Sequence, residues 1–149
     1  MEIERKFLTD LKNLPFRPED FPCRKIEQGY LCTSPVVRIR RDNDEYFLTY
    51  KSKGLMVREE YNLPLTEESY EHLRQKIDGR LITKIRYVIP LEEGLSLELD
   101  IFEGSLAPLV LAEIEFPDQE SAATYKAPEW LGEDVTMSPR YHNSTLSML

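Results

Sequence analysis

Hydrophobic and polar residues alternate with period two over much of the chain, a pattern typical of β-strands that bury one face. The alternation begins at residues 1–8, where Glu2, Glu4 and Lys6 share one side. Clusters of turn-forming residues separate the alternating segments, for example Asp42-Asn43-Asp44 and Gly54. The sequence therefore predicts about eight strands, most of them joined as consecutive antiparallel hairpins. After residues 1–8, the alternating segments are 26–31, 36–41, 45–53, 55–63, 81–89, 95–102 and 110–116.

Only residues 67–78 carry a clear helical signal. Thr66 can cap the first turn, Gly79 suits the position after the last turn, and Tyr70 lies on the apolar stripe. A second short helix is predicted after Pro117, and residues 9–24 are expected to form a loop or a broken helix. With no internal repeat or long linker, residues 1–149 are predicted to form a single domain.

Composition and charge narrow the function classes. The chain has 149 residues, 41% of them hydrophobic, which is enough for one packed core. The net charge of -8 argues against a duplex nucleic-acid binder. No apolar run approaches the roughly 20 residues needed to cross a bilayer, so we expect a soluble protein without membrane contact. Cys23 and Cys32 are expected to be reduced, as in a cytoplasmic protein; the pattern indicates no particular oligomeric state.

Sorting the charged residues by strand parity places most of them on one face of each strand. An open antiparallel sheet with one solvated face would also alternate in this way. Solvation, however, favours mixed signs, whereas nearly every strand here carries a doublet of one sign, which requires a counter-charge from outside the chain. Closing about eight strands into a barrel with this face inward would accommodate one, because an interior packed with charge must hold water, metal and ligand. The pairs are Glu2 and Glu4, Arg38 and Arg40, Lys51 and Lys53, Arg58 and Glu60, Lys84 and Arg86, Glu98 and Asp100, and Glu113 and Glu115.

Paired carboxylates and clustered cations in one cavity suggest phosphoryl chemistry. Carboxylates two residues apart on a strand lie roughly 6 to 7 Å apart and can share a hard divalent cation. Arg and Lys side chains bind the oxygens of a polyanion such as a chain of phosphates. No glycine-rich phosphate loop, CxxC spacing or Ser/His/Asp grouping is present, and His72 and His142 lie off the charged face.

The run Glu2-x-Glu4-x-Lys6 resembles the ExExK signature of the CYTH family, the triphosphate tunnel metalloenzymes. The doublets from Arg38 to Glu115 follow in the order and rough spacing of that family. The resemblance implies an α+β fold, namely an eight-stranded antiparallel β-barrel with a few flanking helices, that binds a linear triphosphate beside Mg²⁺ or Mn²⁺. Family members include inorganic, thiamine and RNA triphosphatases and class IV adenylyl cyclases.

The resemblance also implies roles for individual residues. Lys6 contacts phosphate or holds the attacking water, and it forms the expected catalytic group with Glu2, Glu4 and Arg40. Gln28 and Tyr30 face inward by parity and can equally be structural. The expected metal ligands are Glu2, Glu4 and Glu115, followed by Glu60, Glu98, Asp100 and Glu113. The expected phosphate-binding residues are Arg38, Arg40, Lys51, Lys53, Arg58, Lys84, Arg86 and, from the tail, Arg140.

Several functions remain open on these grounds. A short chain with little beyond the barrel has few elements to recognise an organic group, so inorganic tripolyphosphate is the first expected substrate. A class IV adenylyl cyclase or a thiamine triphosphatase on the same fold is the alternative. A second alternative is a module that binds polyphosphate or nucleotide without hydrolysing it. The acidic doublets argue against this alternative.

Overall fold

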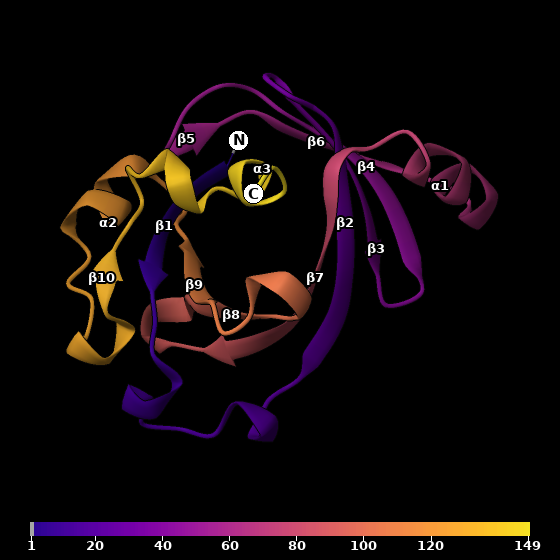
Figure 1. The fold of residues 1–149 in the computed structure, drawn as a ribbon. Helices are drawn as coiled ribbons and strands as arrows, with labels where there is room; N and C mark the ends of the chain where they lie inside the picture. Colours follow the sequence, from indigo (N-terminus) through magenta and orange to yellow (C-terminus); the bar gives the residue numbers. More distant parts are fainter. Residues whose placement is uncertain (1) are drawn as a thin grey trace.

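The computed structural model describes residues 2–149 and shows a nearly closed antiparallel β-barrel with three short α-helices (Figure 1). In the sheet the strands follow the order β10-β1-β9-β8-β7-β2-β3-β4-β6, and β5 pairs with β1. The strands are β1 (Glu2–Leu8), β2 (Cys23–Thr33), β3 (Val36–Asp42), β4 (Glu45–Lys51), β5 (Val57–Arg58), β6 (Glu60–Pro64), β7 (Asp78–Pro90), β8 (Ser96–Phe102), β9 (Val110–Glu115) and β10 (Glu133–Asp134). The helices are α1 (Glu67–Arg74), α2 (Gln119–Thr124) and α3 (Asn143–Leu146).

The barrel closes through β5 and β6, which only Glu59 separates. On one side Arg58 of β5 lies opposite Glu2 of β1, and on the other Glu60 of β6 lies opposite Lys51 of β4. One nearly continuous strand therefore joins the two edges of the sheet. The predicted eight-stranded barrel is confirmed, with the fifth strand split at Glu59 and the two-residue β10 as an addition.

Local sequence signals set most of the boundaries. Asn43 has φ 52° in the two-residue turn between β3 and β4, as the Asp42-Asn43-Asp44 signal predicts. Thr66 caps α1 by accepting a hydrogen bond from the Ser69 amide.

The predicted end of this helix is wrong, because α1 stops at Arg74 and β7 begins at Asp78. Gly79 has φ +67°, and a side chain there would collide with the carbonyl of Ser147. Arg80 donates a backbone hydrogen bond of 2.7 Å to the same carbonyl oxygen. Contact with the C-terminal segment therefore explains the glycine, rather than a helix cap.

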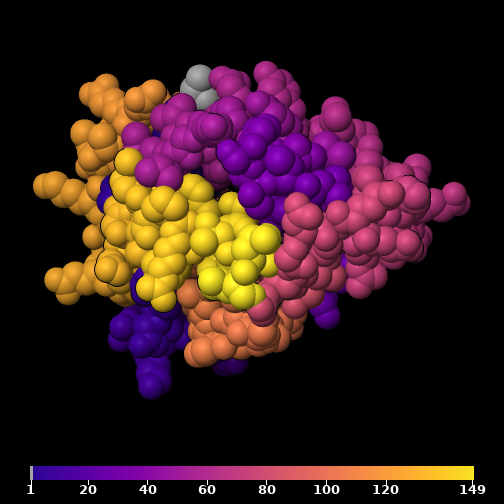
Figure 2. Space-filling view, turned by 45° about the horizontal axis from the view of Figure 1, so that its top comes forward, coloured from indigo at the N-terminus to yellow at the C-terminus, as the bar shows by residue number. Residues whose placement is uncertain are grey.

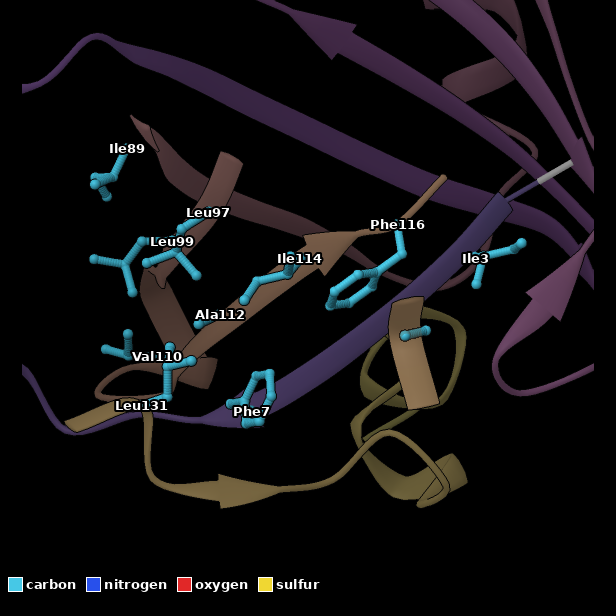
Figure 3. Close-up of a cluster of buried hydrophobic side chains, with 11 residues drawn as sticks. Ile3, Phe7, Ile89, Leu97, Leu99, Val110, Ala112, Ile114, Phe116 and Leu131 are labelled. Atoms are coloured by element: carbon cyan, nitrogen blue, oxygen red, sulfur yellow. The ribbon is translucent and has the colours of Figure 1, made fainter. Parts of the chain in front are cut away.

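The larger hydrophobic cluster lies on the outer face of β1, β8 and β9 (Figure 3). Phe7, Leu99 and Ala112 are almost completely buried there. Ala122 of α2 and Leu131 cover this face together with apolar residues of the loop after β1. The apolar positions predicted to face outward under helices are thus confirmed for these strands, and their burial supplies much of the driving force for folding.

A second hydrophobic cluster lies inside the barrel, at one end. Its strand residues have the same parity as the charged side chains, yet they are apolar and pack against Leu146 of α3. The C-terminal segment lies across this end of the ring in Figure 1 and fills the middle of the face in Figure 2, where it is yellow. We call this cluster the apolar plug; it comprises Tyr30, Val36, Ile82, Phe102, Leu111, Val135 and Leu146.

The plug changes the expected picture of a barrel that is charged throughout. The interior is apolar at the end closed by α3 and charged along the rest of its length. Among residues 2–149, no helix is long and apolar enough to cross a membrane.

Candidate functional site: a charged tunnel

A cavity of about 290 Å³ occupies the charged part of the barrel. Every strand from β1 to β9 contributes side chains of one parity, including Tyr30 and Val36 of the plug, so the alternation in sequence directly produces the lining. Most of the predicted site residues lie here. They are Glu2, Glu4, Lys6, Arg38, Arg40, Lys51, Arg58, Glu60, Arg86, Glu98, Glu113 and Glu115.

Three acidic residues of the lining are bound to neighbouring lysines. The carboxylate of Glu2 lies 3.0 Å from Lys51 Nζ, which also lies 3.3 Å from Glu60. Lys6 Nζ lies 3.5 Å from the carboxylate of Glu113. Burial opposes ionisation of Glu113, but Lys6 and other cations outweigh it and hold its pKa well below the usual range. These carboxylates already have counter-charges within the protein.

Asp100 is also bound, although it was predicted as a possible metal ligand. Its fully buried carboxylate lies 2.7 Å from Arg86 Nε and 2.8 Å from Lys84 Nζ. Glu98 lies 3.3 Å from Arg86 and 3.7 Å from Arg24. The Lys84–Arg86 doublet therefore takes its counter-charge from β8, which contradicts the expectation that such doublets need one from outside.

Glu4 and Glu115 differ from the other carboxylates. They are register partners on β1 and β9, and neither has an ion pair or hydrogen bond through its side chain to any part of the chain described. Burial, reinforced by Glu113 and Glu2, raises the pKa of Glu4 to about 8. Burial together with Glu60 and Glu98 raises the pKa of Glu115. Opposed carboxylates without a partner favour an external cation.

These two carboxylates fit a divalent cation of the Mg²⁺ type. Residues 2–149 contain no group of three acidic, histidine or cysteine side chains arranged as a complete metal cage. Mg²⁺ commonly uses only one or two protein carboxylates, with waters and substrate phosphate oxygens as its remaining ligands. A Glu4–Glu115 pair in a phosphate-binding cavity has this donor set.

Arg38 and Arg40 on β3 form the basic counterpart. Arg38 is buried, and its Nε has no hydrogen-bond partner in the described chain. Arg40 donates a hydrogen bond of 2.8 Å to Gln28, a neutral residue. Burial, then the neighbouring cations Arg38 and Arg86, lowers the pKa of Arg40 to about 9. Two adjacent guanidinium groups without carboxylate partners make this wall suited to an anionic ligand.

Four predicted site residues lie outside the main cavity. Lys53 lines a smaller adjoining hollow of about 150 Å³. Lys84 is completely buried in its ion pair with Asp100. Arg140 is exposed, with its guanidinium 5.5 Å from the ring of Tyr141. For Lys53, Lys84, Asp100 and Arg140, direct contact with a ligand in the main cavity is therefore not supported by their positions.

The structure adds lining residues that the charge pattern does not predict. Phe47 and Thr49 alternate with the apolar residues of β4, so their neutral side chains gave no signal. Lys6 Nζ donates a hydrogen bond of 3.1 Å to the carbonyl of Tyr141, which brings the tail to the tunnel. Tyr30, predicted to line the tunnel or be structural, does line it. The additions are Val36, Asp42, Phe47, Thr49, Asn62, His142, Asn143 and Ser144.

A closed antiparallel barrel with an interior of opposed acidic and basic walls defines a protein of the triphosphate-tunnel class. The CYTH domain model matches residues 1–148, and the chain belongs to the CYTH family. An inorganic triphosphatase of Nitrosomonas europaea is 39% identical, with 99% of this chain and 97% of that protein covered. An inorganic triphosphatase of Acetivibrio thermocellus is 42% identical, with 97% of this chain and 92% of that protein covered.

Solved structures agree with this assignment. The crystal structure of an inorganic triphosphatase superposes with a TM-score of 0.73 at 36% identity and covers 100% of this chain and 95% of its own. A putative adenylyl cyclase from Hippeastrum, described as having a dominant triphosphatase activity, has a TM-score of 0.64 and covers 83% of each chain. At 20% identity, that second likeness concerns the fold alone.

Proposed function

We propose that this protein hydrolyses inorganic tripolyphosphate with the help of Mg²⁺ or Mn²⁺. The single observation that carries the proposal is the pairing of two unsatisfied groups of opposite charge in one cavity. Glu4 and Glu115 lack a cation, and Arg38 and Arg40 lack an anion. A complex of a divalent cation with a polyphosphate satisfies both at once. The names of the two relatives, which match nearly the full chain, support the same activity.

The basic wall would bind and orient the phosphate chain. Arg38 and Arg40 stand two residues apart on the inward face of β3, so their guanidinium groups can bind successive phosphoryl groups. Binding at fixed positions aligns the terminal phosphoryl group for in-line attack and stabilises the negative charge that spreads over its oxygens.

Glu4 and Glu115 would hold the cation. When bound there, a divalent cation supplies positive charge beside the phosphoryl oxygens and makes a neighbouring water more acidic. Glu2, Glu60 and Glu113 are tied to lysines and more readily keep those lysines in place than act as ligands. The proposed metal site is thus narrower than the seven carboxylates expected from the sequence.

Lys6 would act as a cation rather than as a base. Burial lowers the pKa of Lys6, but Glu113 and Glu4 outweigh this effect and raise it above the usual value. A lysine that stays protonated can donate to phosphate or to the attacking water but cannot accept a proton from it. Its bonds to Glu113 and to the tail carbonyl of Tyr141 fix its position.

The experiment that tests the function is a substrate panel. Purified protein is assayed for phosphate release from tripolyphosphate, ATP and thiamine triphosphate with Mg²⁺ or Mn²⁺. The highest kcat/KM is expected for tripolyphosphate, with phosphate and pyrophosphate as products. Formation of cyclic AMP from ATP would instead indicate a cyclase, and binding without release of phosphate from any compound would indicate a binding module.

A further inference from the structure

Phe47 is an aromatic side chain inside an otherwise charged tunnel. It lies on the inward face of β4 with Thr49 and Lys51, and its ring lines the main cavity. Its register partners are Arg40 on β3 and Pro64 on β6. The ring is therefore held beside Arg40, which, like Arg38, lines the tunnel without a carboxylate partner among residues 2–149.

No packing role accounts for this ring. Phe47 belongs to neither hydrophobic cluster, although it is partly buried. Among residues 2–149, no other aromatic ring pairs with it and no cation lies over its face. An apolar group exposed to a polar cavity costs free energy unless a ligand covers it.

Phe47 lies toward the end of the tunnel opposite the apolar plug. Along β3 the inward residues run from Val36, which belongs to the plug, through Arg38 and Arg40 to Asp42. The partner of Val36 on β4 is Lys51, four residues from Phe47, which is about 13 Å along a strand. A phosphate chain on Arg38 and Arg40 would therefore have Phe47 beside its outer end, level with Arg40.

We infer that Phe47 is a stacking surface for a planar aromatic group carried on the outer end of a triphosphate, such as a nucleobase or a thiazolium ring. Such a group has a π-face that stacks on an aromatic side chain with little dependence on its identity. Asp42, which is ion-paired with Arg24, also lines the cavity, and its carboxylate has further lone pairs that can accept a hydrogen bond from the polar edge of the group. This inference rests on the proposed triphosphatase function and extends it to organic triphosphates as weaker ligands.

The test compares organic and inorganic ligands in variants at one position. Inhibition of tripolyphosphate hydrolysis by ATP, by thiamine triphosphate and by ribose 5-triphosphate, which has no aromatic ring, is measured for the wild type, Phe47→Leu and Phe47→Trp. The leucine variant keeps an apolar side chain and removes the π-face. The tryptophan variant retains a π-face and serves as the rescue control.

Phe47→Leu is expected to raise the inhibition constant of the aromatic compounds about tenfold, within the range measured for stacking on one base. KM for tripolyphosphate and inhibition by ribose 5-triphosphate are expected to stay within twofold, and Phe47→Trp to restore the wild-type constants. If the inhibition constant of Phe47→Leu rises for ATP alone, or for thiamine triphosphate alone, the aromatic group that stacks on Phe47 is identified.

Equal effects on all ligands, or none, would overturn the inference. If the wild type does not hydrolyse tripolyphosphate, the proposed function itself fails. Activity on tripolyphosphate together with an unchanged inhibition constant for both aromatic compounds would remove only the role of Phe47.

Discussion

Glu4 of β1 and Glu115 of β9 are register partners, and no cation of residues 2–149 is paired with either carboxylate. Two opposed acids without a partner are unfavourable in an isolated protein. Their arrangement is explained if the functional state includes a divalent cation between them and a bound phosphate chain.

Replacing either carboxylate of this pair is expected to impair catalysis without unfolding the protein. Glu4→Gln and Glu115→Gln should each lower kcat for tripolyphosphate at least 100-fold, because each removes a charged ligand of the metal. The same substitution at Glu68, which is exposed on α1, should leave kcat unchanged. Circular dichroism would confirm folding, and wild-type kcat in both variants would remove the pair from the metal site.

Loss of Arg40 is expected to weaken binding of triphosphate. Arg40→Ala should raise the Kd about 10- to 100-fold, as expected when a charge-assisted hydrogen bond is lost. The fold should persist, because among residues 2–149 the guanidinium of Arg40 is hydrogen-bonded to the neutral Gln28 and forms no ion pair. Arg17→Ala, at an exposed arginine, is the control. Titration calorimetry that gives the same Kd for Arg40→Ala and the wild type would place Arg40 outside the binding site.

The buried carboxylate of Asp100 should contribute to stability. Asp100→Asn leaves Lys84 and Arg86 buried without their shared anion, and such a loss costs about 3–5 kcal/mol. Glu98→Gln affects a partly exposed ion pair and should cost less than about 1 kcal/mol. Urea denaturation measures both. Equal stability of the two variants would show that the Lys84–Asp100–Arg86 cluster does not stabilise the fold.

His142 should make stability depend on acidic pH. Burial, then the cations Lys6, Arg58 and Lys51, lowers the pKa of His142 from 6.5 to about 4. Between pH 6.5 and 4 the unfolded chain binds a proton that the folded chain excludes, so stability falls as pH decreases through this window. His142→Asn should show a shallower decrease in urea midpoint between pH 6.5 and 4.5. An unchanged slope would contradict the burial of a neutral imidazole.

The alternation of charged and apolar residues was sufficient to predict the barrel and most of its lining. It could not show which charges neutralise one another, because this depends on strand register. Arg86 and Asp100 are opposite each other only because of the way β7 and β8 pair. From residue type alone, Lys84 and Arg38 were both predicted to bind phosphate. The strand register shows that Lys84 is ion-paired with Asp100, whereas Arg38 faces the cavity.

The other differences between the predicted and the observed tunnel lining come from inward-facing neutral residues. Ile82, Phe102 and Leu111 have the parity of the charged face, but their apolar character reflects contact with α3, a segment distant in the sequence. Phe47 was obscured by its aromatic and apolar neighbours on β4. The end of α1 was predicted wrongly for a similar reason. Gly79 was interpreted as the residue that ends the helix, whereas a glycine is required there because the backbone of Ser147 lies against it.

Metal-dependent hydrolysis of tripolyphosphate in the tunnel is tested most directly by the rate of phosphate release from tripolyphosphate. This rate is measured for the wild-type protein with Mg²⁺ or Mn²⁺, and again with excess EDTA. The structure predicts rapid release with metal and almost none with EDTA. Release that is equally fast in EDTA, or no release under any metal condition, would contradict it.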